Sequence, residues 1–152
     1  MLSFAIAADH AGFPLKAPLV NLLRQLGNTV VDLGPQQPDP EDDYPDFAAA
    51  VARAVQSGQV QRGIVLCGSG VGATVAANKF KGVRACLCHD IYSAAQGVEH
   101  DDMNVLCLGG RIIGPSLAEA LVKGFAGAAF SAAPRHLRRL KKVQALDEAA
   151  HP

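Results

Sequence analysis

Short apolar runs alternate with helical patterns along the whole chain. The runs are nearly continuous stretches of aliphatic residues, which is typical of strands buried on both faces of a sheet. After the second run, Gly34 and Pro35 begin a polar loop that continues through Asp43. Five strands are predicted, at residues 3–8, 29–33, 64–66, 83–88 and 104–108.

Between these strands, apolar side chains recur every three or four residues, the spacing of one face of a helix. Gly27 ends the first of these stripes, and Gly58 ends the second. Pro18 falls inside the first stripe, and proline is tolerated only in the first turn of a helix. We therefore expect this helix to begin late, near Leu15. The helical stripes cover residues 15–26, 47–55, 73–78, 91–98, 117–125 and 137–143.

The regular alternation of strand and helix predicts a parallel sheet, because each helix carries the chain back to the start of the next strand. Strands that are apolar throughout need helices on both faces of that sheet. A chain of 152 residues is long enough to build one hydrophobic core. The prediction is an α/β fold, a Rossmann-like three-layer α/β/α sandwich around a five-stranded parallel sheet, with residues 1–152 as a single domain.

Ligands bind such sheets at the carboxyl ends of the strands, and this rule brings together segments that are far apart in the sequence. Asp9 and His10 follow the first strand. They could transfer protons or hold a phosphate, or they could be a capping aspartate and a surface histidine. Three further segments are expected at the same edge: the loop after Cys67, residues 89–90, and residues 109–111.

The loop after Cys67 is the most informative stretch of the chain. Its sequence, Gly68-Ser69-Gly70-Val71-Gly72, contains three glycines in five residues. Glycine lets the main chain approach a ligand and turn its N–H groups toward an anion, and the helix predicted next favours negative charge at its start. Cys67 is thus placed to take a proton from one carbon while main-chain donors stabilise the adjacent oxyanion. A packing role in the core is the alternative.

Some candidate residues fall outside that edge. His100 lies just before the last predicted strand, so it is expected at the end of the sheet opposite to Cys67. One site can contain both only if residues 97–103 double back or a second subunit supplies His100. Arg135 and Arg139 share a face of the last helix, where two guanidinium groups suit one phosphate, unless they simply form a solvated basic surface.

Composition narrows the choice of partners and compartment. The formal net charge is zero, so nothing favours a nucleic acid or an anionic membrane as partner. No basic segment precedes the first apolar strand, which argues against a signal peptide and for a cytoplasmic protein. The cysteines fall in apolar runs and are expected to be reduced; zinc binding through two of them and His89 matches no known ligand spacing. They are Cys67, Cys86, Cys88 and Cys107.

Three familiar patterns fit poorly. Cysteine phosphatases need an arginine at the position that Ala73 occupies here. A P-loop needs a lysine directly after its last glycine, whereas the first lysine after this loop is Lys79. The dinucleotide fingerprint is one residue longer than this glycine loop, but Asp90 matches the acid that binds ribose, so a nucleotide-binding module remains an alternative.

Taken together, these segments resemble the ribose-5-phosphate isomerase B family, which includes allose-6-phosphate and galactose-6-phosphate isomerases. The resemblance covers nearly the whole chain, and the motifs occur in the family's order. The matching motifs are Ala8-Asp9-His10-Ala11-Gly12, Asp43-Tyr44-Pro45-Asp46, Cys67-Gly68-Ser69-Gly70-Val71-Gly72, Ala76-Ala77-Asn78-Lys79-Phe80, Gly82-Val83-Arg84-Ala85, Asn104-Val105-Leu106 and Gly109-Gly110-Arg111.

The resemblance implies an isomerase that needs neither a metal nor an organic cofactor. Cys67 would move a proton between C1 and C2 of a sugar phosphate through a cis-enediolate, with Ser69 beside it. His100 would open the sugar ring with help from Asp9, and Tyr44 would line the sugar pocket. Main-chain amides of Gly68, Gly70, Val71 and Gly72 would face the oxyanion, and the phosphate would be held by His10, Arg111, Arg135 and Arg139.

The resemblance also implies a homodimer, in some members a dimer of dimers, with each site shared between two subunits. That arrangement would bring His100 to Cys67. One residue departs from the family pattern: Asp101 follows His100 where many members have asparagine. A carboxylate at this position bears on which sugar phosphate is preferred, and not on the class of reaction. Ribose 5-phosphate, converted to ribulose 5-phosphate, is the expected substrate, with a six-carbon sugar phosphate as the alternative.

Overall fold

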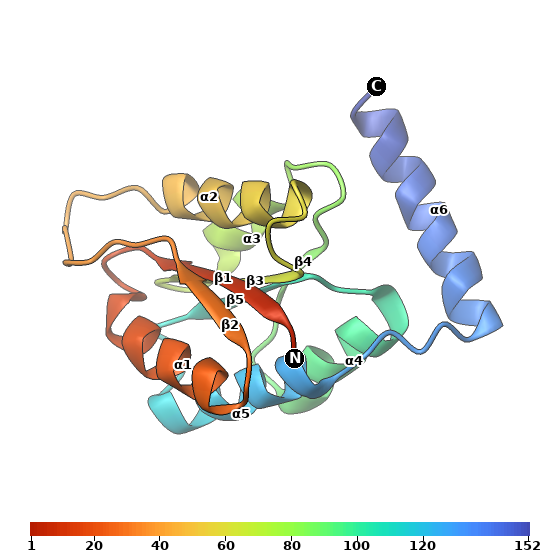
Figure 1. The fold of residues 1–152 in the computed structure, drawn as a ribbon. Helices are drawn as coiled ribbons and strands as arrows, with labels where there is room; N and C mark the ends of the chain where they lie inside the picture. Colours follow the sequence, from red (N-terminus) through yellow and green to blue (C-terminus); the bar gives the residue numbers. More distant parts are fainter.

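The five predicted strands form one sheet in the computed structural model of residues 1–152 (Figure 1). The strand order is β2-β1-β3-β5-β4, and every neighbouring pair is parallel. β1 has β2 on one side and β3 on the other, so the connections that leave β1 and β3 diverge and a crevice opens at their carboxyl ends. The strands are β1 (Ser3–Ala8), β2 (Thr29–Asp32), β3 (Arg62–Cys67), β4 (Ala85–Leu87) and β5 (Val105–Gly109).

Helices cover both faces of the sheet and complete the predicted three layers. α2 and α3 lie on one face, α1, α4 and α5 lie on the other, and α6 stands beside the body next to β4 (Figure 1). No helix is both long and apolar enough to cross a bilayer. The helices are α1 (Phe13–Gln25), α2 (Tyr44–Gln56), α3 (Val71–Ala77), α4 (Ile91–Asp101), α5 (Pro115–Gly127) and α6 (Pro134–Ala150).

Successive residues of each central strand point into two different cores. Phe4 and Ile6 of β1 pack on the side of α1, α4 and α5, whereas Ala5 and Ala7 pack on the side of α2 and α3. All four are completely buried, and β3 and β5 repeat the same alternation. Burial on both faces explains why these strands are apolar at every position.

Glycines allow the loops at the carboxyl edge to pack main chain against main chain. A Cβ on Gly12, after β1, would lie 2.5 Å from the main chain of Leu66 in β3. A Cβ on Gly110, after β5, would lie 2.5 Å from the carbonyl oxygen of Ala11. The N–H of Asp9 donates to the Leu66 carbonyl at 3.0 Å across the same contact. The turn after β1 thus packs its main chain directly against the end of β3 and against the loop after β5.

A buried lysine holds the start of the long loop between β2 and α2. The Lys16 ammonium, on α1, donates to the Asp32 carboxylate at 2.7 and 2.9 Å and to the Pro35 carbonyl at 2.6 Å. The residue is 4% exposed, so its charge is compensated almost entirely by these three oxygens. The loop leaves this point and crosses toward the turn after β1.

The first helix begins earlier than predicted. α1 starts at Phe13, and Pro18 lies inside it, so the expectation of a late start near Leu15 was wrong. Pro14 occupies the first turn, where proline is readily accommodated. Pro14 and Pro18 both face solvent, so water can reach the Pro14 carbonyl that lacks an N–H partner from Pro18.

Other element boundaries moved by a few residues. β4 is shorter than the predicted 83–88, because the chain leaves the sheet after Leu87 and His89 instead accepts a hydrogen bond from the Gly109 N–H at 3.1 Å. α4 continues to Asp101, so residues 97–101 are helical and do not double back. α3 has only seven residues and begins at Val71, two residues earlier than predicted.

Gly12→Ala should destabilise the fold strongly, because its Cβ would meet the main chain of Leu66, which cannot rotate away as a side chain could. We expect a loss of about 1–3 kcal/mol or more in the free energy of unfolding, measured by urea titration. Gly127→Ala, at the end of α5 with no atom within 4 Å of the new Cβ, is the matched control and should be nearly neutral. Equal stability of the two variants would contradict the packing argument.

Candidate active site

Cys67 lies at the last position of β3 and faces the crevice. Its side chain is 4% exposed, and its sulfur accepts a hydrogen bond from the Gly70 N–H at 3.1 Å. Gly70 adopts a left-handed conformation, φ 81°, which turns this N–H back toward the sulfur. An N–H group directed at sulfur stabilises negative charge there. The N–H groups of Gly68 and Ser69 take part in no hydrogen bond within the chain.

The crevice is a pocket of about 330 Å³ above this loop. Arg111, from the loop after β5, packs against Gly68, and a Cβ there would lie 3.7 Å from the guanidinium. Tyr44, from the start of α2, lies across Gly72, where a Cβ would come within 2.6 Å of the phenol ring. The lining residues are Asp9, Tyr44, Cys67, Gly68, Ser69, Gly72, Arg111 and Ile112.

Asp9 has two roles in this arrangement. Its Oδ1 accepts hydrogen bonds from the Ala11 and Gly12 N–H groups, at 2.9 and 3.0 Å, so it caps the turn after β1 as one interpretation expected. The same carboxylate lines the pocket with Cys67, although it is only 6% exposed. Capping fixes its orientation and leaves the second oxygen without a main-chain partner.

His10 pairs with a residue that the sequence did not indicate. Its Nδ1 lies 2.6 Å from Oδ1 of Asp42, which comes from the end of the β2–α2 loop. Together with Asp9 they form the only set of three metal-ligand side chains whose donor atoms lie within reach of one another. Cys86, Cys88 and His89, the zinc alternative, form no such set.

Burial affects the thiols of the three remaining cysteines. Burial raises the pKa of Cys107 to about 12 and that of Cys88 to about 11. Partial burial and the nearby Asp101 carboxylate raise the pKa of Cys86 as well, although this residue keeps a surface open to solvent. These three are therefore protonated thiols at neutral pH and cannot act as bases. All four cysteines are free, as expected for reduced thiols.

His100 and Arg135 belong to a second cluster, away from the pocket. His100, in the last turn of α4, stacks on His136 at the start of α6 with ring centroids 4.0 Å apart. His136 is 3% exposed, and burial together with the charges of its neighbours lowers its pKa. The neutral ring accepts a hydrogen bond from Arg135 Nε at 3.1 Å and donates to the Ser131 hydroxyl at 2.5 Å.

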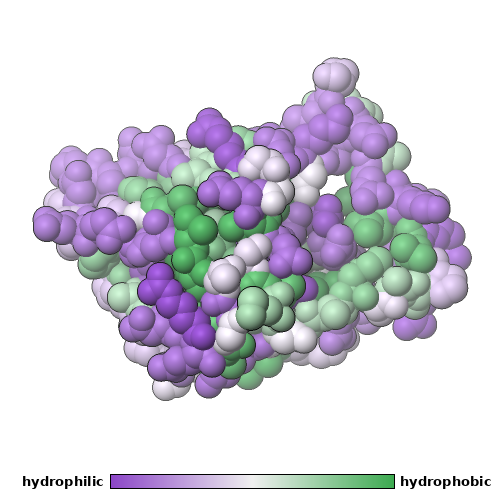
Figure 2. Space-filling view, viewed as in Figure 1, coloured by the Kyte–Doolittle hydropathy of each residue, from purple (hydrophilic) through white to green (hydrophobic).

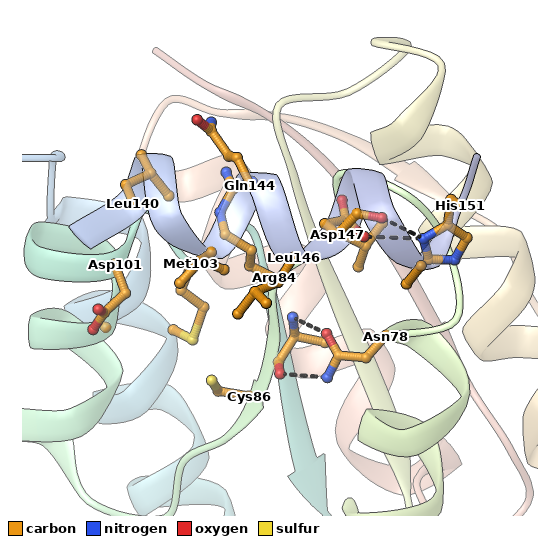
Figure 3. Close-up of a pocket in the computed structure, with 15 residues that line it drawn as sticks. Asn78, Arg84, Cys86, Asp101, Met103, Leu140, Gln144, Leu146, Asp147 and His151 are labelled. Carbon is orange, nitrogen blue, oxygen red and sulfur yellow. Dashed lines mark hydrogen bonds and ion pairs between the residues drawn. The ribbon is translucent and has the colours of Figure 1, made fainter. Parts of the chain in front are cut away.

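α6 touches the body at both ends and leaves a groove under its middle. Besides the His136 contact, Asp147 accepts the Gly82 N–H at 2.6 Å near the carboxyl end. The groove measures about 490 Å³, and Figure 3 shows Asp101 and Met103 on the body facing Leu140 and Leu146 of the helix. In the space-filling view the polar end of α6 projects from the body (Figure 2). Asp101 thus faces this groove.

The structure divides the predicted site residues into two groups. The Cys67 pocket is lined by Asp9, Tyr44, Gly68, Ser69, Gly72 and Arg111, and His10 adjoins Asp9. Gly70 and Val71 do not line it, although the Gly70 N–H contacts the sulfur. His100, Asp101, Arg135 and Arg139 do not line that pocket. β5 begins level with Gly63, four residues or roughly 13 Å before Cys67 along the strand direction. α4 ends at Asp101, just before β5, and so toward the end of the sheet that β5 enters. Placing His100 opposite to Cys67 was therefore correct.

Sequence reasoning missed three side chains near these groups. Asp42 directly precedes the Asp43-Tyr44 motif, and His136 directly follows Arg135, so their neighbours in sequence were the available signal. Gln96 donates its amide N–H to His100 Nδ1 at 2.7 Å, and its position one helical turn before His100 could have indicated this contact.

The chain is similar over most of its length to proteins of one family. The ribose/galactose isomerase family model matches residues 4–143. Ribose-5-phosphate isomerase B of Escherichia coli is 40% identical over 97% of this chain and 98% of its own length. D-erythrulose-4-phosphate isomerase of Pectobacterium atrosepticum is 42% identical over 86% of each chain.

A solved structure is similar to this chain in both fold and sequence. Ribose-5-phosphate isomerase B of Mycoplasma genitalium, with bound ribulose-5-phosphate, superposes with a TM-score of 0.91 at 41% identity and covers 96% of both chains. The names of these relatives describe isomerases, which leaves a non-catalytic nucleotide-binding module without support. The chain belongs to the ribose/galactose isomerase family and is a sugar-phosphate isomerase.

Proposed function

We propose that the enzyme interconverts ribose 5-phosphate and ribulose 5-phosphate, with Cys67 as the base that moves the proton between C2 and C1. The observation that carries this proposal is the sulfur at the base of the pocket, held by the Gly70 N–H beside the unused N–H groups of Gly68 and Ser69. A thiolate there removes the C2 proton from the open-chain aldose. The resulting cis-enediolate places its negative oxygen among these main-chain donors. The hydroxyl proton passes from O2 to O1, the carbon-bound proton returns to C1, and C2 becomes the carbonyl carbon of the ketose.

His100 opens the sugar ring in this proposal, with Asp9 assisting. The Gln96 amide can only donate to His100 Nδ1, so the neutral ring carries its proton on Nε2 and can give it to the ring oxygen. Tyr44 packs beside the sugar, and Ser69 adjoins the base. His10, Arg111, Arg135 and Arg139 hold the phosphate. Neither a metal nor an organic cofactor takes part.

Each site in this proposal is built by two copies of the chain. The Cys67 pocket has a base, main-chain donors and Arg111, but His100, Arg135 and Arg139 lie elsewhere on the same chain. A second copy can supply all three at once, because the His100–His136 stack holds α4 and the start of α6 together. The exposed apolar side chains Val143 and Leu146 on α6 favour such an association. The result is a homodimer, which can pair further into a dimer of dimers.

The size of the sugar is the least constrained part of the proposal. Relatives at similar identity are named for ribose 5-phosphate and for D-erythrulose 4-phosphate. A four-carbon sugar phosphate is therefore a second candidate, beside allose 6-phosphate and galactose 6-phosphate. Turnover of these four sugar phosphates by the purified protein is the direct test. Asp101 is the candidate residue for discrimination among them.

Cys67→Ala should lower turnover of ribose 5-phosphate by at least about a hundredfold, because the general base is lost. Binding of inorganic phosphate should hardly change, since the thiol does not contact that group. Steady-state kinetics and phosphate titration check both expectations. The matched control is Cys86→Ser, which removes the exposed thiol and should retain activity. Substantial turnover by Cys67→Ala would remove Cys67 from the role of base.

Mixing two inactive variants should restore activity if two copies build each site. A dimer of one Cys67→Ala chain and one Arg139→Ala chain contains one intact site and one doubly defective site. Random reassembly then recovers about a quarter of wild-type turnover. Mass spectrometry of the intact dimers confirms that mixed species form. If they form without activity, Arg139 serves the site of its own chain.

Asp101→Asn should change the ratio of kcat/KM between sugar phosphates by roughly tenfold, the effect of one altered hydrogen bond. An ionised carboxylate only accepts hydrogen bonds, whereas the amide also donates, so the two residues favour different hydroxyl arrangements. Kinetics on four-, five- and six-carbon sugar phosphates before and after the change measure this ratio. Unchanged ratios would show that Asp101 does not face the sugar.

A further inference from the structure

Asp42 holds His10 through two hydrogen bonds to a single oxygen. Oδ1 accepts the main-chain N–H of His10 at 3.1 Å and lies 2.6 Å from its Nδ1. The two donors belong to one residue, so this oxygen fixes the imidazole relative to its own main chain. The two residues are 32 positions apart, on loops that follow different strands.

The pair also defines which nitrogen of His10 is available. An ionised carboxylate only accepts, so Nδ1 carries a proton and donates to Asp42. Nε2 makes no hydrogen bond within the chain, and the His10 side chain is 31% exposed. Nε2 is therefore the nitrogen that can meet a ligand. An imidazolium donates to the carboxylate through Nδ1 and to a phosphate through Nε2 at the same time.

Burial makes Asp42 dependent on this contact. Its side chain is only 9% exposed, and its Oδ2 is buried without any hydrogen-bond partner. Burial of a carboxylate is unfavourable unless donors compensate it, and the two N–H groups of His10 are the donors that it has. A buried acid held in this way has a positional role that an exposed acid of the same loop lacks.

We propose that Asp42 is the positioning residue of the phosphate subsite: it fixes the orientation of the His10 ring and keeps Nδ1 protonated, so that Nε2 faces the substrate phosphate. The inference rests on the proposed function through the phosphate-binding role of His10. Asp42 also fixes the end of the loop just before α2, where Tyr44 begins to line the pocket. One carboxylate thus fixes the position of His10, at the phosphate end of the site, relative to that of Tyr44, at the sugar end.

The sign of the effect separates positioning from simple charge. Asp42 is negative, so by Coulomb's law alone its removal should tighten phosphate binding. Positioning predicts the opposite. Asp42→Ala should weaken binding of inorganic phosphate and raise KM by about tenfold, with kcat changed much less, and Asp42→Asn should do so by a smaller factor. Glu41→Gln removes an equal charge from the exposed neighbouring residue and should leave both unchanged.

A double-mutant cycle shows whether Asp42 acts through His10. In a His10→Asn background, Asp42→Asn should cause no further loss of phosphate affinity, measured by calorimetry. Nitrogen NMR of the imidazole should show a protonated Nδ1 in the wild type and a loss of this preference in Asp42→Ala. Asp42→Asn preserves the side-chain shape and carries the test if Asp42→Ala does not fold.

Several results would overturn the proposal: tighter or unchanged phosphate binding in Asp42→Asn, additive losses in the cycle, or unchanged protonation of Nδ1 in Asp42→Ala. Phosphate affinity and Nδ1 protonation are measured without turnover. A wild-type enzyme inactive on ribose 5-phosphate would therefore reject the proposed substrate and still leave the role of Asp42 decided.

Discussion

Main-chain contact between three loops at the carboxyl edge of the sheet sets the geometry around Cys67. A Cβ on Gly109 would lie 2.6 Å from the main chain of the glycine loop, so only glycine permits this approach. The Gly110 N–H donates to the Cys67 carbonyl at 2.7 Å, and the Arg111 N–H donates to the Gly68 carbonyl at 3.0 Å. The residue that carries the guanidinium is thus fixed by the same loop that surrounds the sulfur. The same main-chain contacts therefore set the positions of the base and of the cation.

The charged groups near the predicted site residues are divided between the Cys67 pocket and the start of α6. The pocket contains the Cys67 thiol, the Asp9 carboxylate that caps the turn after β1, and a single arginine, Arg111. The start of α6 is strongly cationic. There a neutral His136 accepts a hydrogen bond from Arg135, and its ring stacks on His100. Because burial and neighbouring cations lower the pKa of His136, that hydrogen bond persists at neutral pH.

The fold was predictable from local pattern, and the site only in part. Strands were found because burial on both faces demands unbroken apolar runs, and the carboxyl-edge rule placed Cys67, Asp9 and Arg111 together. The start of α1 was missed because solvent exposure of Pro18, which decides whether a proline is tolerated, is a tertiary property. Asp42 was missed because its partner His10 lies 32 positions away, with α1 and β2 between them, and no spacing in sequence encodes such a contact.

The distance between the Cys67 pocket and the His100–His136 stack has a thermodynamic consequence for the proposed dimer. A substrate bound between two copies contacts both, so it stabilises their association by the same factor by which association improves substrate affinity. Apparent affinity then depends on enzyme concentration, and dimers persist to greater dilution when substrate is present. The concentration of substrate and the fraction of enzyme present as dimer would then be linked through one equilibrium.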